Sequence, residues 1–201
     1  LCTYMLADAT IMIAGGTLRG AGDTRWVMLT SVSLHWLMLV LLVAVYAAME
    51  LRENFPKGSD PREFMKSLHF MLGISVLILV LVRIAARFSG PTPAIVPQPP
   101  SWQELLGKLL HLAMYTFMIG MPIAGWLILS AEAKPIPFFG LELPALVAKN
   151  KPLAESVEHW HKDIGEWGYY LVGLHAAAAL FHHYVQKDNT LVRMLPWGRK
   201  A

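Results

Sequence analysis

Histidines with the spacing of two cofactor sites lie in one apolar stretch near the end of the chain. Residues 159–184 hold five of the eight histidines, and residues 165–181 are apolar apart from Glu166, His175 and the tyrosine hydroxyls. His161 and His175 are fourteen residues apart. In a helix this places them on nearly the same face, about 21 Å apart along the axis. Such a distance is too long for one small metal ion and suits two large cofactors stacked along one helix.

The elements that must position these histidines are membrane-spanning helices. Of the 201 residues, 55% are hydrophobic and only 15% are charged, whereas soluble domains carry about 25% charged residues. Four stretches are long and apolar enough to cross a bilayer as helices: residues 27–49, 67–86, 105–131 and 159–184. Their links are short or rich in proline, so the sequence predicts an all-α integral membrane protein, a four-helix up-down-up-down bundle with an extra N-terminal helical segment.

Charge and cysteine content narrow the possible functions. The only cysteine, Cys2, excludes disulfides, thiolate clusters and the covalent attachment of c-type haem. The net charge of +3 comes without a basic patch interleaved with aromatic residues, which argues against nucleic acid as a partner. Side A denotes the side on which the first span begins, and side B the opposite one. Nine Lys and Arg residues fall on side A and eight on side B, which slightly favours side A as cytoplasmic.

Alternating topology places four histidines in two pairs at two depths. His35 and His175 lie in the side A halves of the first and fourth spans, and His69 and His161 lie near side B. Ionisable residues inside a membrane are costly and usually functional, and neutral imidazole is an axial ligand of haem iron. The sequence therefore predicts two haems, one held by His35 and His175 and the other by His69 and His161.

Each of these histidines also has a simpler explanation. His35 precedes Trp36 and could be an interfacial anchor, and His69 and His161 could be solvated at an interface. His175 is the hardest to explain in this way, because the residues around it are apolar.

Other polar residues on side A have roles that the sequence leaves open. His182 could contact a quinone carbonyl or a haem propionate, or it could be an interfacial histidine. His111 has no obvious partner in the third span. Arg83 and Arg87 could pair with haem propionates, or they could simply anchor the end of the second span.

Several motifs in order resemble the prokaryotic cytochrome b561 family. They are SLHWLMLVLLVAVYAAMELR, KSLHFMLGIS, RFSGPTPAIVPQPP, EHWHKDIGEWGYYLVGLHAAAALFHHY and KDNTLVRMLP. The resemblance covers about residues 31–201. It implies a four-helix dihaem cytochrome, multi-pass in the bacterial inner (cytoplasmic) membrane, with both termini cytoplasmic. Carried over residue by residue, the four axial ligands of the haem iron fall on His35, His69, His161 and His175.

The resemblance also implies an oxidoreductase. Similar family members act as superoxide oxidases, which pass an electron from superoxide through two haem b groups to ubiquinone. Membrane lipid, quinone and superoxide are then the expected partners. Superoxide is an anion, so basic side B residues could attract it; the candidates are Lys134, Lys149, Lys151 and Lys162.

Two other functions remain open at this point. The chain could be a cytochrome b subunit that serves a partner dehydrogenase or hydrogenase, or a non-redox membrane protein with a metal-binding or structural role. The N-terminus departs from the cytochrome pattern, because LRGAGDTRW resembles a segment of multidrug and toxin extrusion (MATE) transporters. We therefore predict a MATE-like extra segment at residues 1–30 and a dihaem domain at 31–201, although an ordinary juxtamembrane helix is an alternative for the first segment.

Overall fold

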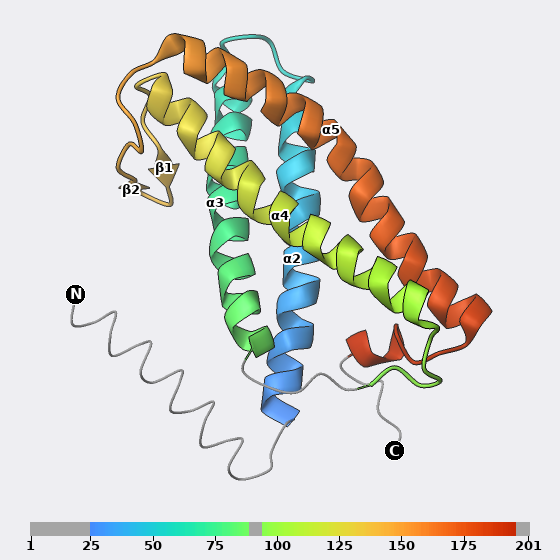
Figure 1. The fold of residues 1–201 in the computed structure, drawn as a ribbon. Coiled ribbons are helices and arrows are strands. Elements are labelled where there is room, and N and C mark those ends of the chain that lie inside the picture. The colour runs from blue at the N-terminus through green and yellow to red at the C-terminus, as the bar shows by residue number, and fades with distance from the viewer. Residues whose placement is uncertain (1–24, 89–93, 196–201) are drawn as a thin grey trace, which may run out of the picture.

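The computed structural model of the chain describes residues 25–88 and 94–195. These residues form mainly four long helices (Figure 1), which are α2 (Arg25–Arg52), α3 (Asp60–Phe88), α4 (Ser101–Ala131) and α5 (Lys151–Phe181). Residues 1–24 of the predicted N-terminal segment lie outside the described part. Because α2 begins at Arg25, one continuous helix passes through the predicted domain boundary at residue 30.

Residues at the N-terminal ends of α3 and α5 stabilise the start of each helix. Asp60 and Glu63 lie in the first turn of α3, where negative charge stabilises the positive end of the helix dipole. At α5, the side chain of Asn150 accepts a hydrogen bond from the backbone N–H of Leu153, and a proline occupies the first turn. This cap starts α5 at Lys151, so the helix begins before the span predicted at residues 159–184.

The four helices form two packed pairs. α2 packs on α3 and α4 on α5, while α3 also packs on α4. In Figure 1 the α4–α5 pair crosses the α2–α3 pair obliquely, and consecutive helices run in opposite directions. The buried core lies where α2, α3 and α4 meet, and consists of Met38, Leu42, Val76, Val80, Met114 and Met118.

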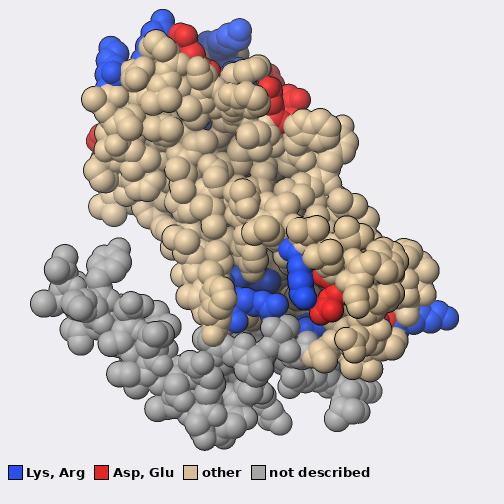
Figure 2. Space-filling model, in the orientation of Figure 1, with Lys and Arg blue, Asp and Glu red and all other residues tan. Residues whose placement is uncertain are grey.

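The outer surface fits an apolar environment over much of its height. Within the described residues, α3, α4 and the part of α2 from Leu29 onward are long and apolar enough to cross a membrane. Figure 2 shows Lys, Arg, Asp and Glu gathered at the two ends, with an uncharged band between them. α5 does not reach the same hydropathy, since Glu166, His175 and tyrosines interrupt its apolar half. A fourth crossing by α5 stays a prediction.

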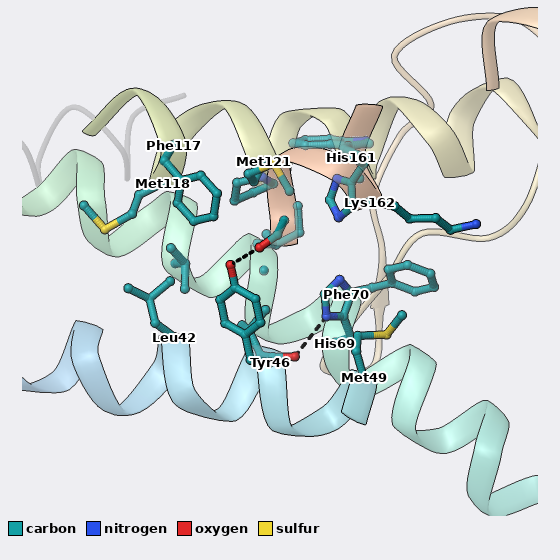
Figure 3. A pocket seen from close by; sticks show the side chains of 18 of the residues that line it. Leu42, Tyr46, Met49, His69, Phe70, Phe117, Met118, Met121, His161 and Lys162 are labelled. Atoms are coloured by element: carbon teal, nitrogen blue, oxygen red, sulfur yellow. Dashed lines mark hydrogen bonds between the residues drawn. The ribbon is translucent and has the colours of Figure 1, made fainter. Parts of the chain in front are cut away.

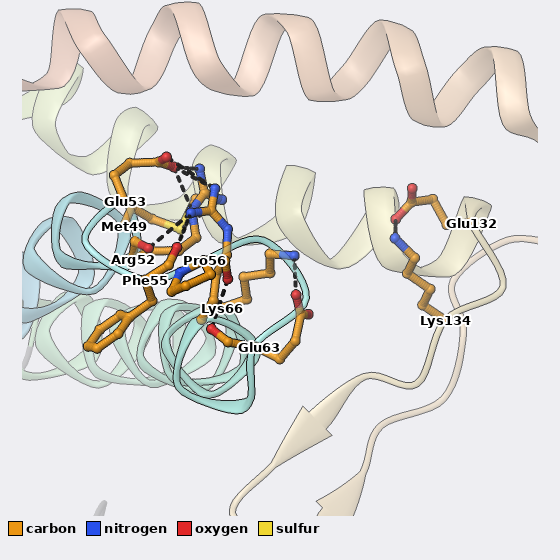
Figure 4. A network of polar contacts seen from close by, with 11 residues as sticks. Met49, Arg52, Glu53, Phe55, Pro56, Glu63, Lys66, Glu132 and Lys134 are labelled. Carbon is orange, nitrogen blue, oxygen red and sulfur yellow. Dashed lines mark hydrogen bonds and ion pairs between the residues drawn. The ribbon is translucent and has the colours of Figure 1, made fainter.

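At side B, a network of ion pairs and hydrogen bonds connects the end of α2 to the start of α3 (Figure 4). Arg62 is only 8% exposed. One of its amino groups donates to the backbone carbonyls of Arg52 and Phe55, and the other contacts both carboxylate oxygens of Glu53 at 3.1 Å. Hydrogen bonds from Arg52 and Arg62 lower the pKa of Glu53. This network fixes the turn between α2, which carries His35, and α3, which carries His69.

The connection between α4 and α5 contains a small hairpin. Strands β1 (Pro137–Phe138) and β2 (Leu141–Glu142) pair antiparallel. Gly140 in the turn has φ +86°, a conformation that glycine adopts at little cost. The indole N–H of Trp126 donates to the carbonyl of Pro144 at 2.9 Å and ties the hairpin back to α4.

Candidate functional site

The side B pair faces a cavity between α2, α3, α4 and α5 (Figure 3). His69 on α3 and His161 on α5 point into it from opposite sides, with ring centres 6.1 Å apart and ring planes at 80°. The cavity has a volume of about 250 Å³. Other lining residues are mostly apolar or aromatic and include Leu42, Tyr46, Phe70, Phe117, Met118, Met121 and Trp126.

One backbone carbonyl orients His69 of the side B pair. The Nδ1 atom of His69 lies 3.1 Å from the carbonyl oxygen of Val45. With the proton on Nδ1, this contact is an N–H donor to the carbonyl, and Nε2 keeps a free lone pair for a metal. Nδ1 of His161 is buried and has no hydrogen-bond partner among the described residues. Buried polar atoms are normally satisfied, so this atom suggests that the cavity holds a further group.

The side A pair has a different setting. His35 on α2 and His175 on α5 have ring centres 6.0 Å apart. His111 on α4, which had no obvious partner in the sequence, lies 5.3 Å from His175 between ring centres. Arg83 donates a hydrogen bond to the carbonyl of Ser31 at 2.9 Å. Three imidazoles and a nearby guanidinium therefore share this end of the bundle.

Both ring separations fit two imidazoles on opposite sides of one iron. Metal–imidazole bonds are about 2 Å long, so the ring centres of two such ligands lie roughly 6 Å apart. Within residues 25–88 and 94–195, no group of three or more His, Cys, Asp and Glu side chains could hold a bare metal ion. A donor set of two histidines suits haem, because the porphyrin supplies the other four ligands.

Comparison with known proteins decides the family. Residues 27–197 match the family model described as "Prokaryotic cytochrome b561". The chain belongs to the prokaryotic cytochrome b561 family. The family resemblance in the sequence is thus confirmed, and the match leaves residues 1–26 outside it.

This cytochrome b561 family member aligns with three curated relatives over nearly the whole length of each relative. "Cytochrome b561 homolog 1" of Escherichia coli (strain K12) is 38% identical over 167 residues, which are 83% of this chain and 95% of that protein. "Probable superoxide oxidase CybB" of Yersinia pestis is 39% identical over 168 residues, 84% and 94% of the two chains. "Cytochrome b562" of Cereibacter sphaeroides is 28% identical over 170 residues, 82% and 91% of the two chains.

Family membership establishes the coarse function. Cytochrome b561 proteins transfer electrons in a membrane and bind haem b. The four histidines singled out in the sequence are the residues that the structure brings into two pairs. Their role as haem ligands stays a prediction, to which the ring spacing adds support.

Two tyrosines of this cytochrome b561 chain also belong to the side B site, although sequence reasoning missed them. The Tyr46 hydroxyl donates to the carbonyl of Gly165 at 2.7 Å, and the Tyr169 hydroxyl donates to a carboxylate oxygen of Glu50 at 2.7 Å. The two rings lie 4.3 Å apart between centres. A tyrosine in an apolar helix needs a partner for its hydroxyl, and that need was the available signal in the sequence.

A close approach of helices depends on one glycine in α5. A Cβ atom on Gly168 would overlap the Tyr46 hydroxyl and the Phe117 ring, whereas one on Gly173 would meet nothing within 4 Å. Gly168 therefore lets α5 come close enough for Tyr46 to reach Gly165.

His182, at the C-terminal end of α5, has a partner that the sequence did not indicate. Its Nδ1 atom lies 2.5 Å from a carboxylate oxygen of Asp188, whose side chain is 2% exposed. His182 thus lies at side A beyond His175, held by a buried acid.

Proposed function

We propose that the chain is a four-helix dihaem cytochrome of the bacterial inner membrane that oxidises superoxide on side B and reduces ubiquinone. The single observation that carries this proposal is the presence of two histidine pairs, one towards each end of the bundle, with ring centres 6.0 and 6.1 Å apart. One such pair would hold a single haem. Two pairs offer a route for electrons from one face of the membrane to the other.

The residues of the chain hold and shield the two cofactors. His69 and His161 would bind one haem iron, and His35 and His175 the other. Each haem, when bound, supplies reversible one-electron transfer. The Val45 carbonyl fixes the tautomer of His69, and the side B cavity would surround the haem with mostly apolar side chains. Arg83 places positive charge near the side A pair.

The choice of superoxide as electron donor rests on the similarity of this chain to one relative. The Yersinia pestis protein named a probable superoxide oxidase is 39% identical over 84% of this chain. The overall reaction balances when two superoxide ions each give one electron, so that ubiquinone and two protons become ubiquinol and two O₂ are released. Protons must therefore reach the quinone along with the electrons.

The basic side B residues are less available to attract superoxide than their number suggests. Lys134, Lys151 and Lys162 pair with glutamates at 2.9, 3.6 and 2.7 Å, respectively. Among the described residues, Lys149 forms no ion pair. If steering operates, Lys149→Glu should slow superoxide-dependent haem reduction and weaken its salt dependence more than Lys162→Glu does. An unchanged rate and salt dependence in both variants would rule steering out.

The test of the proposed function is a direct assay of the holoprotein. Purified protein in detergent or liposomes is given a steady superoxide source and a short-chain ubiquinone, and ubiquinol is measured with and without superoxide dismutase. We expect ubiquinol formation that dismutase abolishes. If the haems are redox-active but superoxide yields no ubiquinol, while a purified dehydrogenase or hydrogenase does reduce them, the chain is instead a cytochrome b subunit of such a complex.

A further inference from the structure

A buried histidine–aspartate pair closes the side A end of α5. The Nδ1 atom of His182 contacts one carboxylate oxygen of Asp188 at 2.5 Å. The side chains are 19% and 2% exposed, respectively. The chain offers a natural contrast on the same helix, where His159 and Asp163 lie 3.3 Å apart with side chains that are 72% and 48% exposed.

The backbone around His182 is built to hold this pair. Residues His182–Gln186 form a π-helical turn, and Lys187 then adopts a left-handed conformation at φ 55°. This reversal lets the backbone N–H groups of Lys187 and Asp188 donate to the carbonyl of His182. The second carboxylate oxygen of Asp188 accepts the backbone N–H of Thr190 at 2.8 Å. The acid is therefore fixed by backbone contacts on one side and faces the imidazole with the other.

Contacts with two other elements fix the following tail beside the side A pair. Asn189 makes two hydrogen bonds with the backbone of Val96, in the link between α3 and α4. The indole N–H of Trp36 donates to the carbonyl of Met194 at 2.7 Å, and Trp36 follows His35 directly. His182 itself is two turns beyond His175, about 10 Å along the helix axis. The pair therefore lies at the end of the bundle that carries the predicted side A haem.

The charged groups near the pair come from the tail and from α3. Arg193 has its pKa lowered by burial and by the positive charge of Arg87, and raised by Asp188. Burial alone would raise the pKa of Asp188, but hydrogen bonds from His182 and Thr190 outweigh burial and bring it below its ordinary value. The carboxylate that faces His182 is thus ionised at neutral pH.

An ionised carboxylate at Nδ1 gives a histidine a defined chemical role. It keeps the Nδ1 proton in place, leaves Nε2 to exchange protons, and stabilises the imidazolium form. Within the described part of the chain, Nε2 of His182 makes no hydrogen bond. This is the arrangement of a positioned proton donor with its orienting acid.

We propose that His182 delivers protons to the quinone and that Asp188 is the positioning residue that holds His182 in the required tautomer. As the quinone accepts an electron, the Nε2–H bond of the imidazolium breaks and an O–H bond forms on a quinone oxygen. Water on side A then returns a proton to Nε2, and a second cycle completes the ubiquinol. This inference rests on the proposed function, since it requires an acceptor that takes up protons with electrons.

The experiment separates haem reduction from haem reoxidation. In stopped-flow measurements on the holoprotein, superoxide first reduces the haems without quinone, and a short-chain ubiquinone then reoxidises them. We expect Asp188→Asn to slow reoxidation at least about tenfold, with haem content and the rate of haem reduction unchanged. Asp163→Asn is the matched control, and it should leave both steps at the parent rate.

Two further readouts distinguish proton delivery from a merely structural role. Added imidazole should restore part of the reoxidation rate of His182→Ala, and it should do nothing for the parent protein. Infrared spectra of the oxidised protein should contain a carboxylate band of Asp188 that is absent from Asp188→Asn. In the parent protein this band should persist at pH values below the ordinary pKa of aspartic acid, because the pKa of Asp188 is lowered.

The possible failures are distinguishable. If Asp188→Asn and His182→Ala reoxidise at the parent rate at every pH, the inference is wrong and the proposed function stands. If slow reoxidation comes with lost haem or gives no rescue by imidazole, the pair is structural and the inference is equally wrong. If the parent haems are not reoxidised by the quinone at all, the proposed function itself fails.

Discussion

Each end of the molecule presents one pair of histidines, and the two pairs have different surroundings. At side B, His69 and His161 face a cavity lined mostly by apolar and aromatic residues, and Nδ1 of His69 contacts the backbone carbonyl of Val45. At side A, His35 and His175 lie beside a third imidazole, that of His111, near the guanidinium of Arg83. The side B cavity is thus also lined by two carboxylates and one ammonium group, those of Glu50, Glu166 and Lys162, whereas the guanidinium of Arg83 places positive charge near the side A pair.

This contrast suggests a direction for electron flow. Positive charge near a haem favours its reduced form, because reduction removes one positive charge from the iron centre. We therefore expect the side A haem to have the higher potential and electrons to run from side B to side A. The buried pair of His182 and Asp188 lies at the side A end, where protons would be needed.

The largest expected effect is the loss of one haem at a time. His161→Ala should lose the side B haem and keep the other, while His35→Ala should lose the side A haem. Haem per chain should fall from two to one in each variant, and the remaining spectra should differ from each other. If one substitution removed both haems or neither, the assignment of separate pairs to separate haems would fail.

The next effect concerns the close packing on side B. Gly168→Ala would push a methyl group against the Tyr46 hydroxyl and Phe117, and such overpacking costs about 1–3 kcal/mol. For a chain of this size, the midpoint of thermal unfolding should fall by roughly 2–12 °C. Gly173→Ala is the control, since its added methyl group meets nothing within 4 Å. Equal midpoints in the two variants would contradict the packing described here.

A smaller effect should separate the two redox centres. Arg83→Gln keeps a hydrogen-bond donor for the Ser31 carbonyl but removes the charge. The higher of two midpoint potentials should fall by about 30–60 mV, since 59 mV corresponds to a tenfold change for one electron. Redox titration of the haem bands measures this. A shift confined to the lower potential would reverse the assignment of potentials to the two ends.

The smallest effect is a pH dependence of stability at side A. The pKa of Asp188 is lower in the folded protein than its ordinary value of 3.8. Its ionised form therefore contributes stability that is present above about pH 4 and is lost as the pH falls through the lower, folded-state pKa. Asp188→Asn should unfold at a lower temperature than the parent at pH 7, and the gap should narrow towards pH 3. A gap that did not depend on pH would show that the charge contributes nothing.

Much of the site could be predicted from the sequence, because the pairing of the histidines depends only on their depth in the membrane. Hydropathy located the long helices, and the alternating direction of the chain then paired His35 with His175 and His69 with His161. The structure has these rings side by side. Helix rise is regular, so depth can be counted from residue numbers.

The remaining contacts depend on helix rotation and on irregular backbone, which residue counting does not give. The position of His111 beside His175 requires the rotation of α4, and the contact of Tyr46 with Gly165 requires the close approach of α2 and α5. The partner of His182 follows from a π-helical turn and a left-handed Lys187. The start of α5 was marked by Asn150 and the proline after it, a capping signal that was present in the sequence but missed.

The most direct test of the central claim is a haem count on the intact protein, combined with a reduced-minus-oxidised spectrum. Two histidine pairs at iron-binding distance predict two haem b groups per chain, both low-spin, with two midpoint potentials in a redox titration. One haem per chain, or a high-spin spectrum, would contradict the assignment of both pairs as axial ligands.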